Sequence, residues 1–229
     1  NNGLGVRGDM KAVVRAILTD IEARDDAVAT NPQYGKVREP VLRLTAFLRA
    51  YKAKSDSGKV LIGNTDDPST SLGQSPLRSP GVFNFFRPGY VPSSGEAAAL
   101  GMTVPEMQTT SESSVAGYAN YMQTGVDKGV GLRGTSDIGI RPDMQPDYTT
   151  ELSQATVPAT LVNTVTSKLL PAPPSAALTN EIVTAVNSIV IPAPNRNNTN
   201  GQAIANAKRN RVLTAVLLTL VSPEFLVQK

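Results

Sequence analysis

An apolar run near the end of the chain, residues 212–221, restricts the fold more than any other feature. Apart from Thr214 and Thr219 it consists of Val, Leu and Ala, and helical periodicity leads into it from about residue 203. A helix that is apolar on every side is stable only when other elements surround it. The run is much shorter than the roughly 18 apolar residues that a bilayer-spanning helix needs. We therefore predict a buried, central C-terminal helix and no transmembrane segment.

Several further segments place apolar residues at spacings of three and four, which is typical of amphipathic helices. Asp9 can cap the first of them, and Thr109-Thr110-Ser111-Glu112 fits the capping box of a later one. In the second segment the stripe consists of Val37, Val41, Leu44, Thr45, Leu48 and Tyr51. The segments are residues 10–21, 37–51, 115–122, 161–169 and 182–190, with a last helix starting at residue 222. We expect the first two to pack as an antiparallel pair and to cover the C-terminal helix.

These patterns predict an all-α fold, mostly helical with long irregular loops, in which orthogonal or bundle-like helical packing surrounds the buried C-terminal helix. One helical domain would span residues 1–229. Residues 55–75 and 125–148 are expected to be surface loops, because they are rich in turn-forming residues and show neither helical nor strand periodicity.

The composition excludes several kinds of chemistry within this chain. It has no cysteine, which rules out disulfides and thiol nucleophiles, and no histidine, which removes the commonest general base and metal ligand. The 22 basic and 19 acidic residues are spread along the chain, so nucleic-acid binding is not indicated. Residues 129–134 match the GxGxxG dinucleotide fingerprint, but the pattern predicts neither a preceding strand nor a following helix. We predict no cofactor, no metal site and no catalytic residue.

The stretch from Leu77 to Tyr90 is the best candidate for a binding site. It combines arginines, prolines and three phenylalanines, and a guanidinium can bind a carboxylate through two parallel hydrogen bonds. The candidate binding residues are Arg78, Asn84, Arg87, Tyr90 and Glu112. The alternative, which we favour, is structural: Phe83, Phe85 or Phe86 would be buried in the core, and the arginines would pair with backbone carbonyls or Glu112.

Residues 152–195 are unusually poor in charge, with only Lys168 and Glu181. Two interpretations stay open. An exported protein can carry such a Thr- and Asn-rich surface, and so can an interface with a partner or with a portion of the same protein upstream of Asn1.

Four segments in order carry a family resemblance: residues 8–18, 36–40, 79–85 and 222–228. Together they resemble the C-terminal part of the bacterial domain of unknown function 1800 family. The resemblance implies a mostly helical, exported protein longer than this chain, located in the periplasm, on the cell surface or outside the cell. It also implies a possible partner, because members are often encoded beside a second exported family, the domain of unknown function 1501. The family has no established catalytic residues, so none is carried over.

Two functions are compatible with the sequence. The favoured one is a noncatalytic structural, assembly or partner-binding module, and the alternative is part of a hydrolase-like enzyme whose active site needs the N-terminal half. Convergence of acids and arginines in one concave pocket would favour the enzyme.

Overall fold

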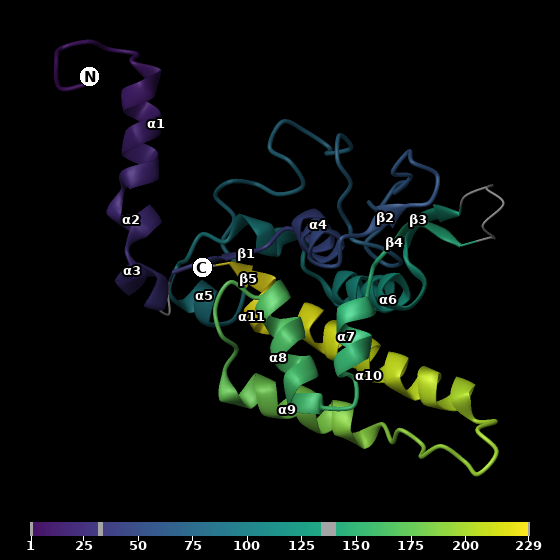
Figure 1. The fold of residues 1–229 in the computed structure, drawn as a ribbon. Coiled ribbons are helices and arrows are strands. Elements are labelled where there is room, and N and C mark those ends of the chain that lie inside the picture. The colour runs from purple at the N-terminus through teal and green to yellow at the C-terminus, as the bar shows by residue number, and fades with distance from the viewer. Residues whose placement is uncertain (1, 32–33, 134–140, 229) are drawn as a thin grey trace. The chain divides into compact units, whose positions relative to one another are not determined.

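The computed structural model describes residues 2–31, 34–133 and 141–228 (Figure 1). The chain divides into two compact units: Asn1–Lys36 with Val227–Lys229, and Val37–Leu226. The sequence-based expectation of a single domain stays a prediction, which one cooperative unfolding transition would support.

The first unit contains three short helices, α1 (Met10–Thr19), α2 (Ile21–Arg24) and α3 (Asp26–Thr30). As predicted, Asp9 caps α1, its side chain accepting hydrogen bonds from the backbone N–H groups of Lys11 and Ala12. None of these three helices contains a buried residue. The prediction that the apolar stripe of residues 10–21 is buried is therefore wrong, and Ile17 and Leu18 are among its exposed members.

The second unit is organised around α10 (Gly201–Leu220), which packs against α6 (Glu112–Lys128), α7 (Thr149–Gln154), α8 (Pro158–Leu169), α9 (Ala176–Ser188) and α11 (Pro223–Leu226) (Figure 1). Its buried face includes Val212, Ala215, Val216 and Leu220. The prediction that α10 is enclosed on every side is wrong, because Leu213, Leu217 and Leu218 are only half-buried. Within this unit, residues 37–51 were also predicted to cover α10, but its main contacts are instead α8 and α9.

Helix α4 (Pro40–Ala50) packs against α8, and its buried face differs from the predicted one. The buried residues are Pro40, Arg43, Leu44 and Phe47, followed by Tyr51. Val41, Thr45 and Leu48, which the sequence pattern assigned to the apolar stripe, are half-buried. The true stripe is rotated by about one residue and places an arginine on the inner face.

The all-α fold class is wrong, although helix predominates: about 51% of the described residues are helical, 7% lie in strands, and much of the rest is irregular. Strands β2 (Lys54–Ser55), β4 (Pro142–Gln145) and β3 (Val130–Arg133) form one antiparallel sheet in that order. A second sheet pairs β1 (Lys36–Val37) with β5 (Val227–Gln228). The predicted surface loop 125–148 therefore contains two strands.

The carboxylate of Asp143, which has no solvent exposure, stabilises the three-stranded sheet. It accepts hydrogen bonds from the Ser55 hydroxyl (2.7 Å) and from the backbone N–H groups of Ser57 (2.7 Å) and Leu61 (2.8 Å). These donors satisfy a buried charge that would otherwise be unfavourable. Sequence periodicity missed this arrangement because β2 and β4 are short and largely polar.

The other predicted surface loop, 55–75, is also partly internal. Thr65, Leu72 and Gln74 are buried, and the Pro68 carbonyl approaches Gly117 of α6 so closely that a Cβ at Gly117 would lie 2.2 Å from its oxygen. The remaining short helices are α5 (Glu96–Ala99) and the 3₁₀-helix η1 (Pro105–Thr109). No helix in the described ranges is both long and apolar enough to cross a bilayer.

Candidate functional site

The segment of residues 75–90 is joined to the start of α4 through Glu39. The Glu39 Oε2 atom accepts a hydrogen bond from Asn84 Nδ2 at 2.9 Å and another from Gln74 Nε2. Asn84 has a backbone φ of +67°, in the left-handed region that asparagine tolerates better than most residues. The predicted binding residue Asn84 therefore fixes the segment in place.

Gln74 is the second anchor, and it is almost fully buried. Its Oε1 atom accepts a hydrogen bond from the Val41 N–H at 3.1 Å, in the first turn of α4. Its carbonyl oxygen accepts a bond from the Thr65 hydroxyl at 2.6 Å. The Gln74 amide thus satisfies a helix N–H that has no partner within the helix.

A cavity of about 160 Å³ lies between these anchors. Its lining includes Glu39, Gln74, Leu77, Asn84 and Phe85. Ligand sites for drug-sized molecules measure roughly 300–1,000 Å³, so this cavity has room for about one side chain. The second carboxylate oxygen of Glu39, Oε1, accepts no hydrogen bond from the described residues and is available to a donor from outside.

Large apolar side chains stand exposed beside this cavity. Leu77 is 105% exposed, Val82 94% and Phe83 64%. Val82 and Phe83 lie in a turn that is closed by a β-bridge between Gly81 and Asn84. The prediction that a phenylalanine of this stretch is buried in the core is wrong, because Phe85 and Phe86 are only half-buried as well.

Leu77 also has an unusual backbone conformation, with a φ of +60°. A bulky residue with positive φ is a real outlier, and such strain is found most often at functional sites.

The other predicted site residues lie apart from the cavity. Arg78 pairs with Asp66 at 2.7 Å rather than with Glu112, and Glu112 is exposed in the first turn of α6. That helix is capped by Ser111, not by Thr109. The Arg87 backbone N–H donates to Gln108 Oε1 at 2.7 Å, and the Tyr90 carbonyl accepts from the Val104 N–H at 2.9 Å.

The structure thus brings only Asn84, of the five predicted residues, into the cavity lining. The predicted arginines do not converge with an acid in this cavity. Sequence reasoning missed Glu39 and Gln74. Glu39 lies 45 positions from its partner Asn84 and 35 positions from its partner Gln74. The one available signal was Glu39 itself, which immediately precedes Pro40 and is therefore placed at the start of a helix.

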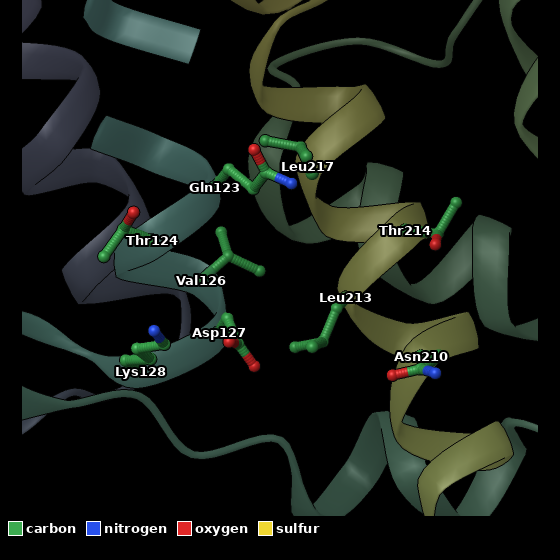
Figure 2. Close-up of a pocket in the computed structure, with 9 residues that line it drawn as sticks. All are labelled: Gln123, Thr124, Val126, Asp127, Lys128, Asn210, Leu213, Thr214 and Leu217. Atoms are coloured by element: carbon green, nitrogen blue, oxygen red, sulfur yellow. The ribbon is translucent and has the colours of Figure 1, made fainter. Parts of the chain in front are cut away.

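A second hollow, of about 410 Å³, lies between α6 and α10 and contains none of the predicted residues. Figure 2 shows Val126 of α6 and Leu213 of α10 pointing into the gap between the helices. Asp127, at its edge, pairs with Arg209 at 2.5 Å. The half-buried face of α10 described above forms one wall of this hollow.

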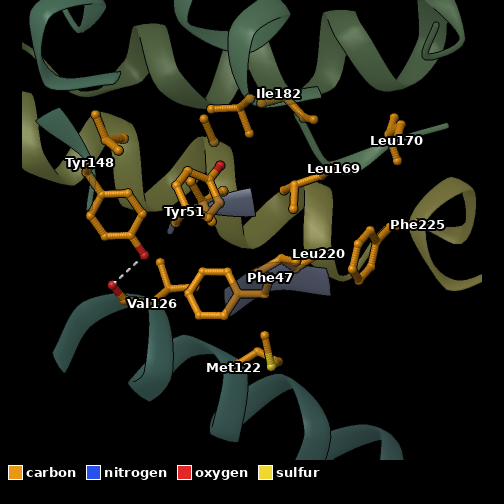
Figure 3. Close-up of a cluster of buried hydrophobic side chains, with 14 of the residues drawn as sticks. Phe47, Tyr51, Met122, Val126, Tyr148, Leu169, Leu170, Ile182, Leu220 and Phe225 are labelled. Carbon is orange, nitrogen blue, oxygen red and sulfur yellow. Dashed lines mark hydrogen bonds between the residues drawn. The ribbon is translucent and has the colours of Figure 1, made fainter. Parts of the chain in front are cut away.

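A buried charged group lies elsewhere in the second unit. Glu151 of α7 has no solvent exposure, and its Oε1 atom accepts a bond from Lys168 Nζ of α8 at 2.5 Å. Lys168 Nζ also lies 5.5 Å from the ring centre of Tyr51, which packs edge-on against Tyr148 (Figure 3). Burial and the Glu151 charge raise the pKa of Tyr51, so its hydroxyl stays protonated. The Tyr51 Oη and Glu151 Oε2 atoms are buried without a hydrogen-bond partner among the described residues.

Among the residues that the structure describes, no cluster of three or more acidic side chains is placed to hold a metal ion. The model of a protein family described as "Protein of unknown function (DUF1800)" matches residues 3–227. No curated protein and no solved structure matches the chain.

Proposed function

Because this chain belongs to the DUF1800 family, whose function is unknown, we propose a role from its own geometry: a noncatalytic module that binds another protein through residues 75–90. The observation that carries the proposal is the exposure of Leu77, Val82 and Phe83 on a segment fixed by Glu39 and Gln74. An exposed group of large apolar side chains commonly marks an interaction surface.

The chemistry of the site indicates what the partner presents. Interface energy concentrates in a few side chains that enter well-fitted pockets, surrounded by contacts that exclude water. The cavity holds about one side chain, and Glu39, whose Oε1 atom accepts no hydrogen bond from the described residues, lines it. The partner therefore inserts a side chain with N–H donors, and its surrounding surface is apolar and packs on Val82 and Phe83.

The segment is also suited to binding because it is ordered before the partner arrives. Association is weakened by the entropy lost when side chains and loops become fixed. Here Asn84 and Gln74 already restrict the backbone, and the β-bridge between Gly81 and Asn84 closes the turn.

The family resemblance suggests where to look for the partner. We propose that the protein acts outside the cytoplasm, and that the exported domain of unknown function 1501 protein encoded beside such genes is the first candidate. The charge-poor stretch 152–195 supports an exported setting.

The test is a binding titration between the purified chain and that neighbouring protein. We expect the double variant Val82→Ser/Phe83→Ser to weaken binding at least tenfold, and Glu39→Gln to weaken it as well. Val190→Ser is the matched control, because Val190 is 78% exposed in the same unit but far along the chain. Equal affinity of all variants would contradict the proposal.

A second experiment does not require that the partner be known. A photo-crosslinking residue placed at position 83 in producing cells should trap a protein, whereas the same residue at position 190 should not. Equal labelling at the two positions would show that segment 75–90 has no special role.

A further inference from the structure

Two arginines, Arg38 and Arg43, lie together at the start of α4. Arg43 is on the buried face of the helix, and its Nε–H donates to the Arg38 carbonyl oxygen at 2.7 Å. The Arg43 guanidinium lies over the ring of Tyr118 with its Cζ 4.9 Å from the ring centre. The Arg38 guanidinium lies in the same way over Phe225, at 4.6 Å.

Neither arginine has an acidic partner among the described residues. None of the four ion pairs in the described ranges includes Arg38 or Arg43. The nearest acid in sequence, Glu39, instead accepts hydrogen bonds from Gln74 and Asn84. Arg43 is only 9% exposed, and a buried charged side chain is normally paired with an opposite charge.

The hydrogen-bond donors of the pair are also largely unused. A guanidinium carries five N–H groups. Within the described part of the chain, Arg43 uses only its Nε–H, and no side-chain hydrogen bond of Arg38 is present. One aromatic ring packs against each guanidinium plane. The N–H groups at the edges of the two guanidiniums are therefore the groups that can bind a ligand.

The electrostatics agree with this geometry. Burial lowers the pKa of both arginines, and the charge of Arg38 lowers that of Arg43 further. Arg43 is therefore desolvated and close to a second positive charge, and no acid of the described residues is paired with either arginine. An anion between the two guanidiniums would offset both the cost of burying the charge and the repulsion between the arginines.

The surroundings hold the pair rigid. The Arg38 N–H donates to the Leu226 carbonyl oxygen at 2.7 Å, so both backbone polar groups of Arg38 are bonded. The Tyr118 hydroxyl donates to the Leu220 carbonyl oxygen at 2.9 Å, which fixes the ring under Arg43. Little further ordering is needed when a ligand binds.

From these observations we infer that Arg38 and Arg43 form a binding site for a doubly charged tetrahedral oxyanion of the phosphate or sulfate type. Two guanidiniums balance two negative charges, and each binds two oxygens through parallel N–H groups. Arg38 is half-exposed and Arg43 is buried, so an anion from solvent would meet Arg38 first. This inference does not rest on the binding role proposed for segment 75–90.

The experiment uses inorganic phosphate as the probe and the whole chain. The melting temperature of the wild type is measured in phosphate, in acetate and in chloride at equal ionic strength and pH. We expect a rise of a few degrees in phosphate only, as mass action predicts for a ligand of the folded state. No rise in phosphate, or an equal rise in acetate, would overturn the assignment.

Variants locate the effect. Arg38→Gln should weaken phosphate binding at least tenfold in a ³¹P NMR titration, and Arg43→Lys, which keeps the charge but loses the planar fork, should weaken it severalfold. Arg49→Gln is the control, because Arg49 is an exposed arginine on the same helix. It should bind phosphate within about twofold of the wild type.

A purely structural role makes the opposite prediction for the unliganded protein. If Arg38 served only to stabilise the fold, Arg38→Gln would melt lower in chloride by as much as in phosphate. Under the inferred role, Arg38→Gln changes the melting temperature in chloride only slightly, because the lost contact with Phe225 and the removed repulsion oppose each other, whereas the rise in phosphate is lost. A large loss in chloride with unchanged phosphate binding would refute the inference.

Discussion

Lys168 Nζ lies 2.5 Å from Glu151 Oε1, and this contact joins α8 to α7. Glu151 is fully buried, whereas the Lys168 side chain is 32% exposed. Removing the lysine leaves an uncompensated buried carboxylate, and breaking a buried ion pair costs about 3–5 kcal/mol. We expect Lys168→Met to lower the free energy of unfolding by about 3 kcal/mol, the low end of that range, because Lys168 keeps contact with water.

Urea unfolding at neutral pH measures this effect. The double variant Lys168→Met/Glu151→Leu should recover most of the loss, since an apolar pair of similar volume replaces the ion pair. If Lys168→Met were as stable as the wild type, the contact between Lys168 and Glu151 would contribute nothing to the free energy of unfolding.

Because of the Asp143 carboxylate, we expect the free energy of unfolding to depend on pH in the acidic range. Burial alone would raise its pKa, but hydrogen bonds from the Leu61 N–H, the Ser55 hydroxyl and the Ser57 N–H outweigh burial and lower the pKa to about 2. The unfolded value is about 3.9. The stabilisation is therefore present in full above about pH 4 and is lost as the pH falls through about 2.

Asp143→Asn provides the comparison, because an amide keeps the shape but not the charge. We expect its urea midpoint to lie below that of the wild type at pH 5 and above, with the gap closing between about pH 4 and pH 2. A gap that is constant over this range would mean that the charge of Asp143 is not responsible.

Exposure predicts a clear contrast between two phenylalanines. Phe47 has no exposure, so Phe47→Ala should cost about 3–5 kcal/mol. Phe83 is largely exposed, and Phe83→Ala should change stability by less than about 0.5 kcal/mol. Thermal or urea unfolding of the two variants checks this, and a strongly destabilised Phe83→Ala would show that segment 75–90 is a structural element.

Helix glycines provide another contrast. Alanine normally stabilises a helix interior relative to glycine by about 1 kcal/mol. At Gly117 the new Cβ would lie 2.2 Å from the Pro68 carbonyl oxygen, so we expect Gly117→Ala to destabilise by about 1–3 kcal/mol. At Gly201 nothing lies within 4 Å, so Gly201→Ala should be neutral or stabilising. Equal stability of both variants would contradict the close approach of the two backbones.

The sequence predicted the elements whose signal is local. Helices α8, α9 and α10 follow from apolar residues at helical spacing, and Leu161, Ile182 and Val216 are fully buried as that spacing indicates. The sheet escaped prediction because β4 is defined by partners far along the chain, such as Lys54 opposite Gln145.

In the candidate sites, too, residues with a local sequence signal were predicted and those defined by distant partners were not. Asn84 was identified from its local surroundings, but its partner Glu39 is 45 residues away, and no sequence pattern links the two. Arg43 was missed for another reason: taken by residue type, an arginine in an amphipathic helix belongs to the solvent face. Only the packing of α4 reveals that position 43 shares a face with Leu44 and Phe47.

The hydrogen bond from Tyr118 to Leu220 joins residues 102 positions apart, and the bond between Ser55 and Asp143 spans 88. Closing such long loops loses chain entropy before the contacts form. Folding rates fall as the average separation of contacting residues grows. Despite its helical content, the second unit should therefore refold in milliseconds or slower rather than in microseconds. Its individual helices form within microseconds. The rate-limiting step is therefore the association of α6 with α10 and of β2 with β4.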